Sequence, residues 1–149
     1  MSNYGIYTLS FKFDINLLKL SKIEVSTLGN AIKSARLRRG WSQYELGEKV
    51  GIHADTIYLL EKDKGKVHVN YILKLEKVLK CSLKGYDSYY DFSRNTISSI
   101  KSIRKSLGMT QGKFAHHIGV CKTTIGKWEC GLSHVPRKQY EILKSKGLI

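Results

Sequence analysis

Two lysines and two threonines lie close together in the second half of the chain, at Lys122, Thr123, Thr124 and Lys127. A lysine ammonium group donates hydrogen bonds to phosphate or to the O6 and N7 atoms of guanine, and a threonine can hydrogen-bond or contact a thymine methyl group. Any one of these lysines, taken alone, is accounted for as a solvated surface charge. Their grouping favours binding to a polyanion.

Residues that could hold a metal or carry out catalysis do not form a recognisable set. His116, His117, Cys121 and Cys130 match no ordinary spacing of zinc ligands, and the two cysteines fall at opposite ends of one predicted helix. The chain has no HExxH motif, no phosphate-binding glycine loop and no nucleophile paired with a base. We therefore expect no metal site, no cofactor and no enzymatic activity, which disfavours a nuclease or recombinase.

The charge of the whole chain also points to an anionic partner. Its 149 residues include 26 Lys and Arg against 12 Asp and Glu, a net charge of +14. Residues 1–80 hold 14 basic and 8 acidic side chains, and residues 81–149 hold 12 and 4. The excess is therefore spread over both halves, and nucleic acid or an anionic membrane surface is the partner that it attracts.

The sequence gives no indication of a membrane. No apolar run approaches the ~20 residues that span a bilayer, and the N-terminus lacks the basic and apolar regions of a signal peptide. The three cysteines, Cys81, Cys121 and Cys130, are odd in number and suit free thiols in a reducing compartment. We expect a cytoplasmic protein that makes no membrane contact.

An internal repeat organises the chain. Residues 32–63 and 100–131 align without a gap at an offset of 68 residues and share 10 identities in 32 positions. Two copies indicate a tandem pair of domains, because a solenoid needs more units.

Each copy shows the spacing and the end signals of short helices. In the first copy, Ser42 and Glu45 form a capping box at the start of a second helix, and a third helix is predicted over residues 54–61. Asn70 is predicted to cap a fourth helix. The second copy repeats this plan, with Thr110 as the cap of its second helix.

These signals predict domains at residues 27–84 and 96–149, joined by a linker at 85–95 whose aromatic side chains we expect to pack on a domain. Residues 1–26 precede them, and apolar residues alternate with polar ones over residues 6–15, which predicts a half-buried β-strand. Two interpretations of this strand stay open. It pairs with a second copy of the chain to form a homodimer, or it packs on its own domain.

Two stretches, residues 28–52 and 108–136, carry a family signature. It is clearest in Gly40-Trp41-Ser42-Gln43 and in Gly108-Met109-Thr110-Gln111, each followed by small residues and a turn glycine. Both stretches resemble the lambda-repressor/Cro (XRE-type) helix-turn-helix family. The resemblance implies an all-α fold of two tandem lambda-repressor-like helix-turn-helix bundles. The short N-terminal β-strand, which the alternating pattern predicts, would be an addition to that fold.

The resemblance also implies where DNA would lie. In this family the third helix enters the major groove and the start of the second helix holds the phosphate backbone. In the second copy the implied DNA-binding residues are Gln111, Lys113, Lys122, Thr123, Thr124, Lys127, His134 and Arg137. In the first copy they are Gln43, Tyr44, Asp55, Thr56, Tyr58 and Lys66. The resemblance further implies two structural ion pairs, Arg36 with Glu61 and Arg104 with Glu129.

The function implied is that of a sequence-specific regulator of transcription, a repressor, that binds double-stranded DNA in the cytoplasm at the nucleoid. Proteins of this family are commonest in bacteria, phages and mobile elements. The alternative is a regulator that binds protein, such as an antitoxin, an antirepressor or an anti-defence protein. It rests on the first copy, where Asp55 would repel phosphate and Leu59 is apolar, so that the first domain would contact a protein partner.

Overall fold

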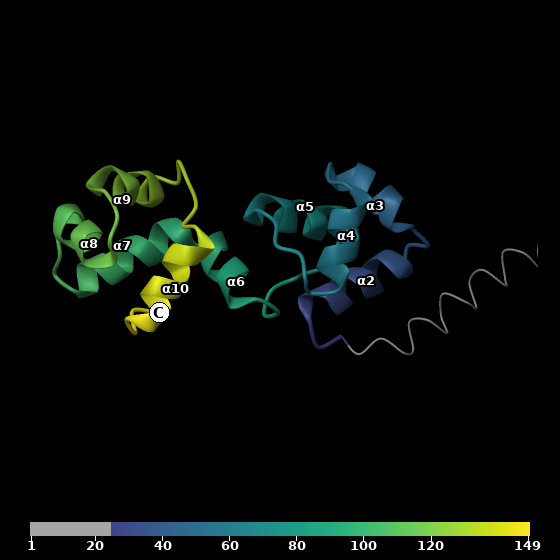
Figure 1. Ribbon diagram of the computed structural model, residues 1–149, viewed down its shortest axis with the longest axis horizontal. Helices are drawn as coiled ribbons and strands as arrows, with labels where there is room; N and C mark the ends of the chain where they lie inside the picture. The colour runs from purple at the N-terminus through teal and green to yellow at the C-terminus, as the bar shows by residue number, and fades with distance from the viewer. Residues whose placement is uncertain (1–24) are drawn as a thin grey trace, which may run out of the picture. The chain divides into compact units, whose positions relative to one another are not determined.

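The computed structural model describes residues 25–149, which fold into helices joined by short turns, and no strand occurs between Val25 and Ile149. The chain divides into two compact units at the boundary between Tyr86 and Asp87 (Figure 1). The strand expected at residues 6–15 lies outside the described residues. No helix between Val25 and Ile149 is long and apolar enough to cross a membrane.

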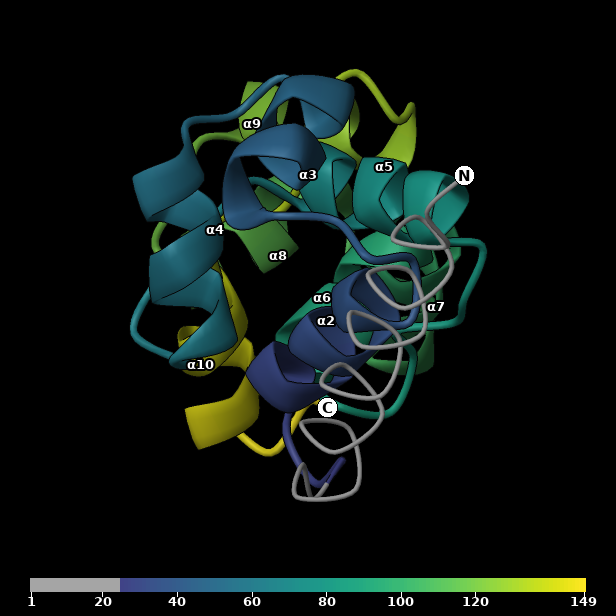
Figure 2. The ribbon, with the colours of Figure 1, turned by 90° about the vertical axis from the view of Figure 1, so that its right-hand side faces the viewer.

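The first unit, residues 25–86, is a helical bundle. Its helices are α2 (Leu28–Leu37), α3 (Gln43–Val50), α4 (Ala54–Glu61) and α5 (Val69–Leu79). Both α2 and α3 pack against α4 and α5, and these four helices are labelled in Figure 2. The short turn between α3 and α4 brings these two helices into the most extensive contact in the unit.

Local signals explain where these helices begin and end. The Ser42 hydroxyl accepts a hydrogen bond from the Glu45 amide at 3.1 Å, and the Glu45 carboxylate accepts one from the Ser42 amide at 2.6 Å. This is the expected capping box, which satisfies two amides at the helix start. At the other end of α3, Gly51 adopts a left-handed conformation with φ of 79°, which favours glycine and turns the chain sharply towards α4.

The start of α5 differs from the prediction at Asn70. The helix begins at Val69, and the side chain of His68 accepts a hydrogen bond from the Asn70 amide at 3.3 Å. His68 therefore occupies the N-cap position in place of Asn70. Histidine is not among the side chains that usually cap helices, which is why the sequence pattern pointed two residues further on.

The core of the first unit combines one face of every helix. Ile32, Leu46, Ile57, Ile72 and Leu75 are all completely buried. They lie on α2, α3, α4 and α5, so each helix contributes to the same apolar interior. Burying a side chain of this size stabilises the fold by about 1.5–3 kcal/mol.

The second unit, residues 87–149, has five helices. They are α6 (Ser88–Arg94), α7 (Thr96–Ser106), α8 (Gln111–Ile118), α9 (Lys122–Glu129) and α10 (Arg137–Ser145). The last four begin 68 residues after α2, α3, α4 and α5 respectively, which is the offset of the sequence repeat. Ile100, Phe114, Ile125, Trp128 and Leu143 form the buried core of this unit.

The segment expected to be a linker, residues 85–95, contains α6, and from Asp87 onwards it belongs to the second unit. Asp87 caps α6 by accepting hydrogen bonds from the amides of Tyr89 and Tyr90. The rings of Tyr89 and Phe92 lie 5.5 Å and 5.3 Å from the ring of Tyr140 on α10. The helix is stabilised because its aromatic side chains pack against α10 and are removed from water.

Candidate nucleic-acid interface

A buried ion pair joins the first and third helices of the first unit. Arg36 Nε lies 2.6 Å from Glu61 Oε1, and Arg36 Nη2 donates to Glu61 Oε2 at 2.9 Å. Only 8% of the Arg36 side chain and 3% of the Glu61 side chain are exposed. Arg36 Nη1 also donates to the carbonyl oxygen of Trp41 at 2.7 Å. The guanidinium group thus connects α2, α4 and the turn that precedes α3.

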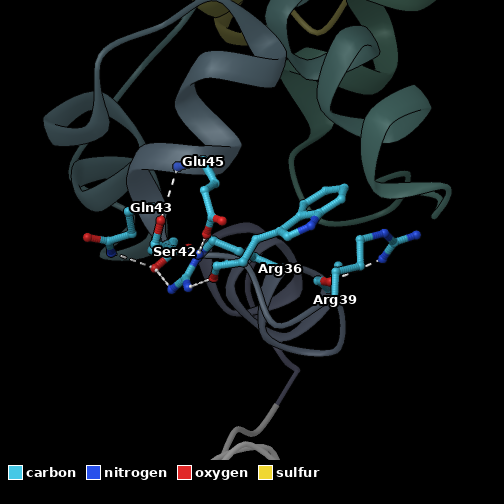
Figure 3. Close-up of polar contacts among 8 residues, drawn as sticks. Arg36, Arg39, Ser42, Gln43 and Glu45 are labelled. Carbon is cyan, nitrogen blue, oxygen red and sulfur yellow. Dashed lines mark hydrogen bonds and ion pairs between the residues drawn. The ribbon is translucent and has the colours of Figure 1, made fainter. Parts of the chain in front are cut away.

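Gln43, the first residue of α3, completes this cluster. Its Nε2 atom donates to Glu61 Oε2 at 2.8 Å, so the amide of Gln43 and the guanidinium of Arg36 converge on one carboxylate (Figure 3). The side chain is half-buried, and Figure 3 shows its amide oxygen on the side away from Arg36. The cluster therefore holds Gln43 in one orientation and leaves its acceptor atom available.

The second unit repeats this cluster with equivalent residues. Arg104 Nε lies 2.6 Å from Glu129 Oε1, and Gln111 Nε2 donates to Glu129 Oε2 at 2.8 Å. Arg104 Nη1 donates to the carbonyl oxygen of Met109 at 2.9 Å. The hydrogen bond from Arg104 holds the pKa of Glu129 below its usual value, and the bond from Gln111 acts the same way against the opposing effect of burial.

The outward face of α9 is basic and polar. Lys122, Thr123 and Lys127 are exposed and Thr124 is half-buried, whereas the opposite side of α9 carries the buried core residues. Lys113 is exposed on α8, the neighbouring helix. The structure therefore groups these predicted residues on two adjoining helices. Cys121 lies at the N-cap of α9, where it is exposed and makes no capping hydrogen bond.

The outward face of α4 is different in kind. Tyr58 is 49% exposed and Leu59 is 42% exposed, and Asp55 is exposed on the same face. Thr56 is half-buried, and Tyr44 on α3 is 66% exposed. This face is therefore acidic and apolar. Lys66, in the loop after α4, is also exposed.

A family model described as helix-turn-helix matches residues 32–85, from within α2 to beyond the end of α5. No curated protein and no solved structure matches the chain. The first unit contains a helix-turn-helix domain. Its motif is α3, the turn at Gly51, and α4, which places Gln43 at the start of the first motif helix and Tyr58 on the second. The expected all-α fold with a helix-turn-helix domain is therefore confirmed.

Arg137 is a predicted DNA-binding residue that makes contacts within its own unit. Its Nη2 atom lies 2.8 Å from Asp87 Oδ2, and its guanidinium lies 4.3 Å from the ring centroid of Tyr89. Asp87 and Tyr89 belong to the start of the second unit and precede α8 and α9 in the sequence. Arg137 therefore holds α10 to α6, and its contact with a phosphate stays a prediction. His134, also predicted to lie at DNA, is half-buried in the loop after α9.

Asp63 is a residue that the sequence analysis missed. It follows α4 in a left-handed conformation with φ of 55°. Its carboxylate accepts hydrogen bonds from the Thr27 hydroxyl at 2.6 Å and from the Gly29 amide at 2.8 Å. Asp63 thereby joins the end of the second motif helix to the start of α2. The sequence did contain one signal for this role, which is an Asp directly after the end of a predicted helix. Asp adopts the left-handed conformation more readily than most residues do.

The helix-turn-helix domain and the second unit are both basic. Residues 25–86 contain 12 basic and 6 acidic side chains, and residues 87–149 contain 11 and 4. Within the described residues, no group of three or more His, Cys, Asp or Glu side chains could hold a metal ion. Both units therefore carry the positive charge that favours binding to DNA, and the outward face of α9 adds exposed polar side chains.

Proposed function

We propose that this chain is a sequence-specific regulator of transcription, a repressor, which binds double-stranded DNA through two helix-turn-helix heads. The first head is the helix-turn-helix domain at residues 32–85. The second head comprises α7, α8, α9 and α10. The proposed activity is binding alone, in the cytoplasm at the nucleoid, without a chemical reaction.

The observation that carries the proposal of a second head is the repeated polar cluster. Arg104, Glu129 and Gln111 make the same set of hydrogen bonds as Arg36, Glu61 and Gln43, at positions 68 residues further along the chain. Such a cluster fixes the angle between the helices that it joins, because each group has its charge and hydrogen-bonding needs met in only one arrangement.

In the proposed complex α9 lies in the major groove and the start of α8 faces the phosphate backbone. Lys122 and Lys127 would donate to guanine or phosphate, and Gln111 and Lys113 would contact the backbone. Amide groups at a helix start favour an anion there. Once one head is bound, the linkage raises the local concentration of the other, so that two modest heads bind tightly without dimerisation of the chain.

Selection of bound sequences from random duplex DNA tests this proposal. The full chain is compared with the variant Lys122→Ala/Lys127→Ala and with a control of equal charge loss, Lys144→Ala/Lys146→Ala, which changes exposed lysines at the end of α10. We expect a motif with two unlike half-sites, of which the first variant loses one and the control loses neither. Salt-sensitive binding without any enriched motif would contradict the proposal.

A second candidate function is regulation through a protein partner. The observation that favours it is the apolar outward surface of the first unit, where Tyr44, Tyr58 and Leu59 are all exposed. In this case the chain is an antitoxin, an antirepressor or an anti-defence protein whose first unit binds another protein. A stoichiometric partner that co-purifies with the full chain, and is lost in Leu59→Lys while DNA binding is unchanged, would support it.

A further inference from the structure

The outward faces of α4 and α9 occupy equivalent places in the repeat and carry opposite chemistry. On α9 the face consists of Lys122, Thr123, Gly126 and Lys127, and on α4 the equivalent positions are Ala54, Asp55, Tyr58 and Leu59. Both lysine positions of α9 are therefore apolar on α4. The polar threonine is replaced by an acid, and glycine by a tyrosine that is 49% exposed.

This difference determines which parts of a duplex each face can contact. Asp55 gives the outward face of α4 a negative charge that repels phosphate, whereas Glu61, the other acidic residue of the helix, is buried and paired with Arg36. Apolar side chains in the major groove contact the methyl group at C5 of thymine, and an Asp carboxylate accepts a hydrogen bond from N4 of cytosine. Neither contact requires a positive charge on the helix.

We propose that the first unit recognises a thymine-rich half-site through the C5 methyl groups, which Leu59 and Tyr58 contact, with Asp55 accepting from a cytosine amino group. The second unit then recognises a guanine-containing half-site through Lys122 and Lys127. This inference rests on the proposed DNA-binding function and adds the kind of base pair that each head selects.

The surroundings of Leu59 support this role. Its carbonyl oxygen accepts hydrogen bonds from the amides of Lys64 and Gly65, both at 2.9 Å. A Cβ atom at Gly65 would lie 3.0 Å from Leu59 Cβ, so the loop is packed against the base of this side chain. The backbone of Leu59 is thus fixed, while 42% of the residue stays exposed.

The positive charges that the α4 face lacks are supplied at its end. Lys62, Lys64 and Lys66 are exposed at and after the C-terminus of α4. They can neutralise phosphates beside the groove while the apolar face meets the bases. At the other end of the helix, the Nδ1 atom of His53 accepts a hydrogen bond from the Asp55 amide at 3.3 Å, which fixes the backbone at Asp55. The face is therefore apolar between flanking polar groups.

Replacement of thymine by uracil tests the inference directly, because it removes only the methyl group. The full chain is titrated with synthetic duplexes that carry the selected sequence, with deoxyuridine placed in one half-site or in the other. We expect affinity to fall about fourfold for each lost methyl that is contacted, the effect of one buried methyl-sized group. The loss should occur in the half-site of the first unit and be absent in the other.

A pair of reciprocal variants assigns the effect to α4. Leu59→Lys introduces the residue of the equivalent α9 position, and Lys127→Leu does the reverse. We expect Leu59→Lys to abolish the uracil effect and to shift selection in that half-site towards guanine, while Lys127→Leu introduces a preference for thymine in the other. Both positions are exposed, so thermal melting should be nearly unchanged.

The outcomes separate this inference from the function on which it rests. Two enriched half-sites with no uracil effect in either would overturn the thymine assignment and leave the regulator intact. A single half-site that depends on Lys122 and Lys127 alone would show that the α4 face does not meet DNA, and would also overturn it. Without any enriched sequence, the proposed function itself fails.

Discussion

The guanidinium group of Arg137 lies over the ring of Tyr89, with 4.3 Å between its central carbon and the ring centroid. The same group lies 5.3 Å from the ring centroid of Tyr90 and 2.8 Å from a carboxylate oxygen of Asp87. Arg137 therefore makes stabilising contacts within its own unit. Its position next to Lys138, which is exposed, gives a direct comparison between a structural and a free positive charge.

Replacing Arg137 by alanine should lower the stability of the second unit by about 1–2 kcal/mol, because it removes a partly buried cation–π contact and a half-exposed ion pair. DNA affinity, measured well below the melting temperature, should change little. Lys138→Ala removes the same charge and should leave stability unchanged. Weaker DNA binding by Arg137→Ala at unchanged stability would instead support the predicted contact of Arg137 with DNA.

Glu61→Gln should destabilise the first unit by about 3–5 kcal/mol, because it leaves the buried Arg36 charge without its counter-ion. Glu129→Gln should cost less, since 15% of the Arg104 side chain is exposed against 8% of Arg36. Urea denaturation can follow each unit separately through its own tryptophan, Trp41 or Trp128.

The double variant Arg36→Met/Glu61→Leu provides the control for this ion pair. It removes both charges and refills the space with apolar groups, so it should be more stable than Glu61→Gln. A double variant as unstable as the single one would mean that packing, and not the stranded charge, accounts for the loss.

The stability of the second unit should fall with acid through Glu129. The pKa of this carboxylate is held below the ordinary 4.5 by Arg104, so the unfolded chain binds the proton more tightly than the folded one. The stabilisation is therefore complete above the unfolded value and is lost as the pH falls through the lower folded pKa.

Thermal melting between about pH 7 and about pH 3 measures this contribution. The difference in melting temperature between the wild type and Glu129→Gln should shrink as the pH falls. Glu141→Gln, which changes an exposed residue on α10, serves as the control and should run parallel to the wild type. A constant gap between the wild type and Glu129→Gln would contradict the proposed linkage.

Gly29→Ala should destabilise the first unit by about 1–3 kcal/mol, the range for overpacking. An added Cβ would lie 2.5 Å from the Leu60 carbonyl oxygen and 2.8 Å from that of Glu61, so α2 and α4 would have to separate. Gly126→Ala, in the middle of α9, has no atom within 4 Å of the added Cβ. Gly126→Ala should stabilise the second unit by about 0.5–1 kcal/mol. Chemical denaturation should therefore show changes of opposite sign in the free energy of unfolding for the two variants.

DNA should protect Cys121 from alkylation. This thiol is exposed at the N-cap of α9, the helix proposed to enter the groove, so the bound duplex would cover it. Cys81 should react slowly with or without DNA, because burial raises the pKa of its thiol. Mass spectrometry after a short iodoacetamide pulse distinguishes the sites, and equal labelling of Cys121 in both states would argue against this orientation.

The sequence predicted well those parts of the fold that depend on local signals. Ser42 and Thr110 cap their helices as expected, because the cap and the amide it binds are only three residues apart. The pairing of Arg36 with Glu61 followed from a family resemblance and not from local spacing. The DNA contacts of α9 stay a prediction, since only its exposed face is described.

What the sequence did not predict depends on contacts between distant segments. The helix at residues 88–94 exists because Tyr140, about 50 residues later, offers its ring to Tyr89 and Phe92. The ion pair of Arg137 with Asp87 was not predicted either, because nothing local identifies Asp87 as its partner. Asp63 was missed in the same way, since Thr27 and Gly29 lie at the far end of another helix.

The contacts between α6 and α10 have a practical consequence for dividing the chain. Near the start of the second unit, Asp87 forms an ion pair with Arg137 and Tyr89 packs against Tyr140. These contacts join the beginning of the unit to its last helix. A fragment that starts at residue 96, where the sequence repeat suggests a domain boundary, would lack α6. The ring of Tyr140 would then be exposed to solvent, and we expect this fragment to aggregate. A fragment that starts at Asp87 retains these contacts, and we expect it to be the better unit to express alone or to fuse to another protein.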